Sequence, residues 1–192
     1  MGGMADRPAR LTSATAAAAP TRRWTPRRFG TSLGVVLLLL VVGSVTGLLP
    51  LRVMRVDSGS MSPTIATGDL VAVERGAGEV DRSDVVVASH PDTGEPLVKR
   101  VVGLGGDQVA IEDGVLVVDG EPVCESAVDP ARQDGVWFGP VTVPAGEVFL
   151  LGDDRGGSID SRDFGTVPAD DIEGHVGFRV WPSPGPLPVD AC

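Results

Sequence analysis

Apolar residues form one long uncharged run near the start of the chain and several short runs after it. Residues 30–49 contain no charged side chain and end at Pro50, and as an α-helix these 20 residues would span about 30 Å. That length matches the hydrocarbon core of a bilayer, so the pattern predicts a transmembrane signal anchor over residues 30–50. A cleaved signal peptide or a buried helix is the alternative, but no Ala-x-Ala site follows the run.

The apolar runs beyond the anchor are short, rich in valine and separated by turn residues, which is typical of β-strands. They predict strands at 69–75, 84–90, 96–103, 108–112, 115–118, 147–151 and 175–181. Asp113-Gly114, between two of these runs, is a strong hairpin signal. The chain contains 26 Gly and 16 Pro, which disfavour long helices. The sequence therefore predicts an all-β, antiparallel domain behind one N-terminal transmembrane helix.

Charge divides the chain into two parts. Residues 1–50 contain six Arg and one acidic residue, a net charge of +5, whereas residues 51–192 contain ten basic and 25 acidic residues, a net charge of −15. Basic residues that flank a span stay in the cytoplasm, and four arginines precede the anchor where two follow it. This predicts a single-pass protein of the cell membrane, with a disordered cytoplasmic tail over residues 1–29 and residues 51–192 outside. The bilayer is then a partner, and the acidic domain argues against nucleic acid.

The cysteines and histidines carry little functional signal. Cys124 and Cys192 could form one disulfide in an oxidising compartment, but the sequence leaves their state open. His90 and His175 stand alone, without the spacing of metal ligands. Neither a metal nor another cofactor is predicted.

Lys99 is the only lysine, because the other fifteen of the 16 basic residues are arginine. Arginine cannot be deprotonated in a protein, whereas a buried lysine can lose its proton near neutral pH. Lys99 lies within a valine-rich predicted strand, where its side chain must either turn to solvent or be buried. A leftover lysine in an arginine-rich composition is the alternative that the residue by itself leaves open.

Three further clusters contain residues that could carry chemistry. Residues 57–64 read Asp-Ser-Gly-Ser-Met-Ser-Pro-Thr, and residues 68–70 read Gly-Asp-Leu at a turn into a strand. A Ser/Gly/Pro stretch alone is most often a loop. Residues 152–165 form a glycine-rich charged segment after a hydrophobic run, which by itself is equally typical of a cation-binding loop or a solvated one.

The order of these clusters resembles the motif set of bacterial type I signal peptidases. The set reads S-G-S-M-x-P-T, G-D-L, K-R-V-x-G and G-D-x-R-x-x-S-x-D-S-R-x-x-G, behind an N-terminal anchor. The chain departs from it by Asp154, where Asn is common, by its single anchor, and by a stretch without motif at 105–145. The resemblance implies an antiparallel β-sheet catalytic domain of the signal-peptidase type at 51–104 and 146–192, with an inserted β hairpin subdomain at 105–145.

The resemblance also implies a role for individual residues. Ser60 would be the nucleophile and Lys99 the general base, a Ser-Lys dyad. The Ser58 hydroxyl would complete the oxyanion hole with the Ser60 N–H, and Ser158 would hydrogen-bond the Lys99 amine and orient it. Structural ion pairs would come from Arg100, Asp153, Asp160 and Arg162. The walls of a substrate pocket for small side chains would come from Met61, Ile65 and Val98.

The implied function is that of a membrane-bound serine endopeptidase, which removes signal peptides from exported preproteins after small residues. A Ser-His-Asp hydrolase is a weaker hypothesis, because no G-x-S-x-G motif is present. A self-cleaving Ser-Lys domain, as in stress-response repressors, would need a DNA-binding module. The alternative from another class is a non-catalytic, membrane-tethered β interaction module, in which Ser60 and Lys99 could be replaced without effect.

Overall fold

The computed structural model describes residues 33–36, 38–39, 42–43, 50–76, 78–128 and 137–188. The predicted tail at 1–29 lies outside these residues, as does much of the predicted anchor at 30–50. Residues 33–36, 38–39 and 42–43 are helical. Within the described ranges, no helix is both long enough and apolar enough to cross a bilayer.

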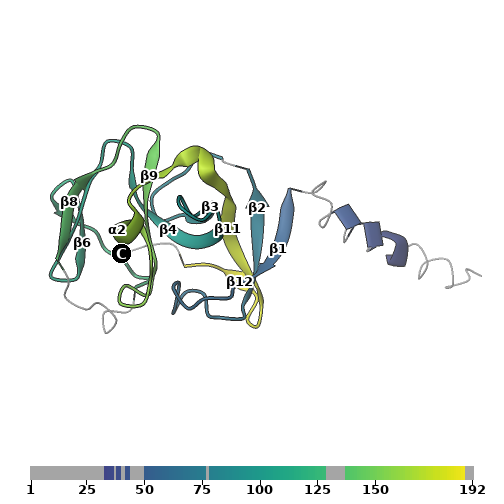
Figure 1. The fold of residues 1–192 in the computed structure, drawn as a ribbon. Coiled ribbons are helices and arrows are strands. Elements are labelled where there is room, and N and C mark those ends of the chain that lie inside the picture. Colours follow the sequence, from purple (N-terminus) through teal and green to yellow (C-terminus); the bar gives the residue numbers. More distant parts are fainter. Residues whose placement is uncertain are drawn as a thin grey trace, which may run out of the picture. The chain divides into compact units, whose positions relative to one another are not determined.

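An eight-stranded antiparallel sheet forms the larger part of the fold, in the order β1-β2-β11-β3-β4-β9-β10, with β12 paired to β11. Figure 1 shows its central strands β3 and β4 between β9 and β11. Its strands are β1 (Leu51–Arg55), β2 (Leu70–Arg75), β3 (Val85–Ser89), β4 (Pro96–Leu104), β9 (Glu147–Leu151), β10 (Val167–Pro168), β11 (Ile172–Trp181) and β12 (Gly185–Pro186). Two short helices lie between β9 and β11: α2 (Ser161–Phe164) and the 3₁₀ turn η2 (Ala169–Asp171).

A second, four-stranded antiparallel sheet is built from the residues between β4 and β9, in the order β7-β6-β5-β8. Its strands are β5 (Gln108–Glu112), β6 (Val115–Val118), β7 (Glu121–Pro122) and β8 (Phe138–Thr142). Asp113 and Gly114 join β5 to β6, and both have positive φ angles, 52° and 82°. This is the two-residue hairpin geometry that Asp-Gly predicts.

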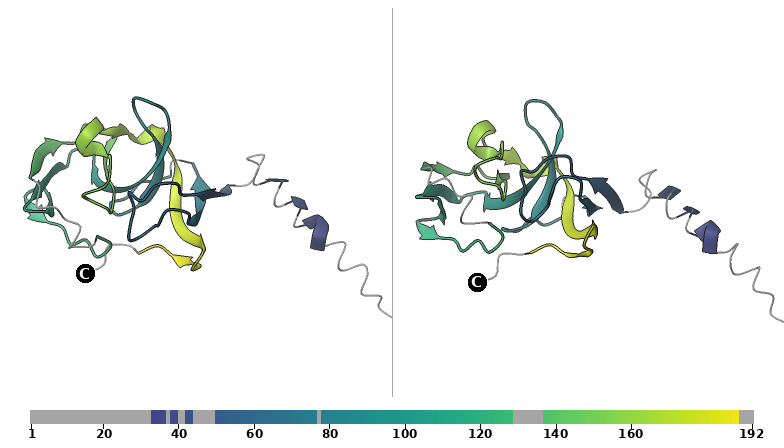
Figure 2. Two further views of the ribbon diagram at one scale, coloured as in Figure 1. Left: turned by 60° about the horizontal axis from the view of Figure 1, so that its bottom comes forward. Right: turned by 90° about the horizontal axis from the view of Figure 1, so that it is seen from below.

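Strands β4 and β9 connect the two sheets. Val102 of β4 and Phe149 and Leu151 of β9 are buried in one apolar cluster with Val109 and Leu116 of the second sheet. Figure 2 shows the green strands of the second sheet at one end of this arrangement, with the blue β1 and yellow β11 at the other. β4 therefore continues from the larger sheet toward the smaller one, and Lys99 lies near its middle.

The prediction of a mostly antiparallel β fold is confirmed, and the predicted bounds of β5, β6 and β9 match those observed. β1 and β8 were not predicted. The apolar side chains of Leu51 and Val53 in β1 face solvent. The sequence of β1 therefore does not show the alternation of buried apolar and exposed polar residues that predicts a strand. β8 contains Gly139-Pro140, which reads as a turn. An added Cβ at Gly139 would lie 2.7 Å from the Val109 carbonyl oxygen, so glycine permits the close approach of β8 to β5.

Candidate active site

Ser60 lies in the loop between β1 and β2, which is closed at its base by backbone hydrogen bonds. The Val56 N–H donates to the Asp69 carbonyl at 2.9 Å, and the Gly68 N–H donates to the Val56 carbonyl at 2.7 Å. Gly68 has a φ of 95°, which glycine adopts without strain. The Asp69 carboxylate accepts the Ala66 N–H at 3.1 Å. The Gly-Asp-Leu cluster thus ends and braces the loop that carries Ser60.

Lys99 reaches Ser60 from the middle of β4. Its Nζ donates to Ser60 Oγ at 2.8 Å and to the Val98 carbonyl at 3.2 Å. The two residues are only 4% (Lys99) and 9% (Ser60) exposed. Among the residues that the structure describes, no carboxylate lies within ion-pair distance of the amine. Lys99 is therefore a buried amine whose hydrogen-bond acceptors among these residues are uncharged oxygens.

Burial is the main influence on the charge of this amine. Desolvation lowers the pKa of Lys99 from its ordinary value of 10.5, and the negative charges of Asp160 and then Asp153 oppose that shift. Because desolvation disfavours the charged form, more of the amine is neutral near pH 7 than in water. A neutral amine beside a hydroxyl can accept its proton.

Ser58 lies on the other side of the nucleophile candidate. The two hydroxyl oxygens, Ser58 Oγ and Ser60 Oγ, are 3.3 Å apart, and either can donate. Ser58 also lines an open cavity of about 280 Å³. The lining residues come from the end of β1, the loop that follows it and the start of β4: Met54, Arg55, Val56, Asp57, Ser58, Pro96, Leu97, Val98 and Lys99.

The predicted pocket residues fall into two groups. Val98 lines the cavity beside Lys99, as a pocket wall would. Met61 and Ile65 are 0% exposed and belong to a core cluster that includes Val71 and Val73. They pack in the core that supports the Ser60 loop, and neither side chain is accessible to a ligand in this structure. The sequence does not distinguish an apolar residue that fills the core from one that faces a cleft.

The charged loop at residues 152–160 contacts Ser60 at its backbone carbonyl. The Asp154 N–H donates to the Ser60 carbonyl oxygen at 3.0 Å. Gly152 makes the approach possible, since a Cβ there would lie 2.2 Å from Ser158 Oγ and 2.5 Å from the Ser60 carbonyl oxygen. The loop and the nucleophile candidate are therefore in direct contact, although more than ninety residues separate them in the sequence.

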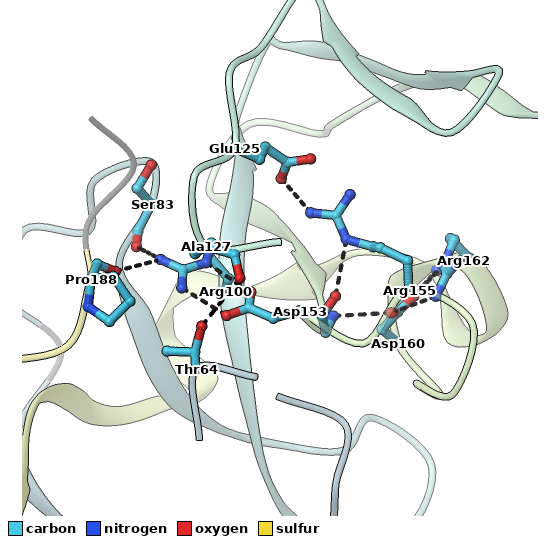
Figure 3. Close-up of polar contacts among 11 residues, drawn as sticks. Thr64, Ser83, Arg100, Glu125, Ala127, Asp153, Arg155, Asp160, Arg162 and Pro188 are labelled. Atoms are coloured by element: carbon cyan, nitrogen blue, oxygen red, sulfur yellow. Dashed lines mark hydrogen bonds and ion pairs between the residues drawn. The ribbon is translucent and has the colours of Figure 1, made fainter. Parts of the chain in front are cut away.

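The four predicted ion-pair residues form two pairs around this loop (Figure 3). Arg100 donates from Nε and Nη2 to both oxygens of Asp153, each at 2.8 Å, and the two side chains are 1% and 0% exposed. Arg162 donates to both oxygens of Asp160 at 2.8 and 2.9 Å. The Asp160 carboxylate also accepts the Gly152 N–H at 3.0 Å and caps α2. The pairs tie the loop to β4 and to α2.

Ser158 does not make the predicted hydrogen bond with Lys99. Its Oγ is buried against Gly152 and finds no hydrogen-bond partner in the described part of the chain. The Lys99 amine uses Ser60 and the Val98 carbonyl instead. The hydroxyl is close to the site, but its orientation differs from that expected of a residue that orients the amine.

Two contacts near the site involve residues that the sequence did not single out. Arg155 forms a buried ion pair with Glu125, and Thr64 Oγ1 donates to the Ala127 carbonyl at 3.5 Å. Arg155 belongs to the charged motif, which could have drawn attention to it, but Glu125 lies in the stretch without motif. Its neighbour Cys124 is disulfide-bonded, and the chain's one other cysteine, Cys192, lies outside the described residues. Over those residues, no cluster of three His, Cys, Asp or Glu could hold a metal ion.

Comparisons with known proteins show which family the chain resembles. Residues 27–181 match the model of the family described as "Signal peptidase, peptidase S26". Signal peptidase I of Bacillus caldolyticus is 39% identical over 142 residues, 66% of this chain and 78% of that protein. Signal peptidase I of Streptococcus pneumoniae is 32% identical over 187 residues, 78% of this chain and 91% of that protein. A solved signal peptidase I from Enterococcus faecalis V583 is 30% identical, covers 51% of this chain and 97% of its own, and superposes with a TM-score of 0.46.

Proposed function

Because the chain belongs to the signal peptidase family S26 and is a serine endopeptidase that removes signal peptides, we propose that Ser60 and Lys99 form its catalytic dyad. One observation carries the assignment: the Nζ of a buried lysine, which has no carboxylate partner among the described residues, lies 2.8 Å from a serine hydroxyl. An amine in this environment is the general base that a serine needs when no histidine is nearby.

The proposed reaction proceeds in two acyl-transfer steps. Neutral Lys99 accepts the Ser60 proton as Oγ attacks the scissile carbonyl carbon, and a tetrahedral oxyanion forms. The Ser60 N–H and the Ser58 hydroxyl donate to that oxyanion, which stabilises the transition state more than the substrate. The ammonium of Lys99 then gives its proton to the departing amine as the C–N bond breaks. Water, activated by the same amine, hydrolyses the ester and restores Ser60.

The structure offers a place for an extended substrate next to the dyad. β4 pairs with β9 only from Arg100 onward, whereas residues 96–99 pair with β3 on one side and line the cavity on the other. A peptide segment could therefore add as a strand along this edge of β4, with its backbone aligned by main-chain hydrogen bonds. The cavity of about 280 Å³ beside Lys99 could receive side chains near the cleaved bond.

The location of the domain is part of the proposal. We infer that residues 30–50 anchor the chain in a single pass and that residues 51–192 lie outside the cell membrane, with 105–145 as an inserted β subdomain. The charge asymmetry supports this orientation. Exposed apolar side chains on β1 and β11, the two strands that flank β2, fit a surface close to lipid: Leu51, Val53, Phe178 and Trp181.

The dyad is tested with detergent-solubilised protein and a preprotein substrate. Ser60→Ala and Lys99→Arg should each lower kcat/KM by about 10⁴-fold or more, while circular dichroism shows an unchanged fold. Arginine keeps the positive charge but cannot act as a base, so it separates the two roles of the side chain. Full activity of Lys99→Arg would exclude the amine as the base, and full activity of Ser60→Ala would exclude its hydroxyl as the nucleophile.

A further inference from the structure

Residues 123–128, here called the bridging segment, follow β7 and leave the second sheet toward the catalytic loops. None of these residues belongs to a catalytic motif, but Ala127 and Val128 are only 5% and 4% exposed. A motif-free segment that is buried against an active site has a structural or positioning task. Its contacts indicate which of the two.

The bridging segment contacts both loops that build the site (Figure 3). On one side, Thr64, four residues after Ser60, donates a long hydrogen bond of 3.5 Å to the Ala127 carbonyl. On the other side, Arg155 of the charged loop donates to the Glu125 carboxylate. The side chains of this second pair are 3% and 4% exposed, so the ion pair is almost completely shielded from water.

Arg155 transmits this contact to the nucleophile. Its Nε donates to the Gly152 carbonyl at 3.0 Å, which fixes the turn formed by residues 152–155. The Asp154 N–H in the same turn donates to the Ser60 carbonyl at 3.0 Å. A continuous chain of hydrogen bonds therefore runs from Glu125 through Arg155 and the turn to Ser60.

We propose that Glu125 is a positioning residue for the Ser60–Lys99 dyad, acting through Arg155 and the 152–155 turn without touching either reacting group. The inference rests on the proposed dyad. It gives the bridging segment a function in the reaction: holding the turn at the distance from which it fixes the backbone of Ser60.

The electrostatics of the pair explain why the carboxylate matters. Arg155 is buried, and its Nη1 already lacks a hydrogen-bond partner among the described residues. Without Glu125, the guanidinium would be an uncompensated buried charge, and the turn would move to bring it to water. A displacement of about 1 Å at Ser60 can lower a rate by about 100-fold.

The test compares Glu125→Ala with Glu125→Gln, and uses Glu173→Ala as the control. Glu173 also pairs with an arginine, Arg52 at 2.8 Å, but makes no hydrogen bond or ion pair to either catalytic loop among the residues described. Below its unfolding temperature, Glu125→Ala should lose about 10- to 100-fold in kcat with little change in KM. Glu125→Gln, which keeps an acceptor oxygen, should recover part of the loss. Glu173→Ala should keep its kcat.

The pH profile separates positioning from a loss of stability. A loosened turn admits water to Lys99, which raises the pKa of its amine, so the acid limb of kcat/KM in Glu125→Ala should move to higher pH. If Glu125→Ala is folded and keeps both the wild-type kcat and the wild-type acid limb, the proposal is wrong.

A second variant covers the case in which Glu125→Ala does not fold. Replacing both partners, Glu125→Met with Arg155→Met, removes the buried charges while it keeps apolar volume. This double variant should fold but lose the bond to the Gly152 carbonyl, and with it about 10-fold or more in kcat. Full kcat would contradict the positioning role. Loss of activity in Ser60→Ala and Lys99→Arg tests the dyad itself, so the two failures can be told apart.

Discussion

Lys99 and Arg100 are consecutive residues of β4, and both are buried, yet their surroundings differ completely. Arg100 is 0% exposed and is bonded through two nitrogens to the Asp153 carboxylate, with further hydrogen bonds to the carbonyls of Ser83 and Pro188. Lys99 is 4% exposed, and within the described part of the chain it bonds one hydroxyl and one carbonyl and no carboxylate. Neighbouring side chains of a strand point to opposite faces. One face of β4 therefore holds a guanidinium that is paired with a carboxylate, and the other holds an amine with no carboxylate partner among the described residues.

The difference shows how the fold assigns two tasks to adjacent positions. On the Arg100 face, the charge is kept and compensated, which joins the strand to the charged loop. On the Lys99 face, the charge is penalised, which makes the amine a better proton acceptor. Asp153 and Asp160 counteract that penalty from a distance, but Arg100 and Arg162 are bonded to them.

The largest expected effect comes from removing the carboxylate that pairs with Arg100. Asp153→Ala leaves the Arg100 guanidinium buried without its carboxylate, and we expect the free energy of unfolding to fall by about 3–5 kcal/mol. Urea unfolding at pH 7 measures this change. The exposed pair of Arg55 and Asp57 provides the control, since Asp57→Ala should cost less than about 1 kcal/mol. Equal effects of the two substitutions would contradict the importance of burial.

A smaller effect of opposite sign is expected at Lys99, whose replacement should raise the free energy of unfolding. The pKa of Lys99 is lowered in the folded protein, so between that pKa and the ordinary value of 10.5 the unfolded chain binds more protons than the folded one. Stability therefore rises with pH across this window. Lys99→Met removes the penalty and should be more stable than wild type at pH 7, by about 1.4 kcal/mol for each unit of the shift.

The pH dependence of this difference is its check. The gain of Lys99→Met should shrink as the pH rises toward 10.5, because the wild-type amine then becomes neutral in both states. Chemical denaturation of the two proteins between pH 7 and pH 10 measures it. A difference that stays constant over this range would mean that the lysine carries its charge in the folded protein.

The smallest expected effect comes from Arg162, which acts on Lys99 through the Asp160 carboxylate. Arg162→Gln leaves the Asp160 carboxylate less compensated, and the charge of that carboxylate raises the pKa of Lys99. The acid limb of kcat/KM should move to higher pH, with a loss of less than about tenfold at acidic pH and little change above neutrality. Arg52→Gln, on β1, should leave the limb in place. A shift toward lower pH in Arg162→Gln would contradict the electrostatic account.

Local patterns in the sequence predict much of the sheet but little of its edges. The valine-rich runs at 108–112, 115–118 and 147–151 match β5, β6 and β9, because buried strands bounded by turns carry both signals. β1 is a surface strand with outward apolar residues, and β8 contains glycine and proline, so each lacks the usual pattern. These strands are set by their pairing with β2 and β5, which local sequence does not report.

The candidate site was predictable where a motif names the residue and not where a contact depends on the fold. Ser60 and Lys99 do meet, and the four charged residues of the motifs do pair. The orientation of the Ser158 hydroxyl and the burial of Met61 depend on packing, and the sequence did not predict them. Glu125 pairs with Arg155 across 30 positions in a stretch without any motif. Only the tertiary structure could reveal it.

The hydrogen bond between Asp154 and Ser60 also has a consequence for biosynthesis. A ribosome adds residues from the N-terminus. A nascent chain therefore contains Ser60 and Lys99 well before it contains Asp154, whose N–H donates to the Ser60 carbonyl. Until β9 and its following loop have been made and have docked, the Ser60 backbone lacks this support. We expect this hydrogen bond to form only after the chain through Asp154 has left the ribosome and β9 has paired with β4.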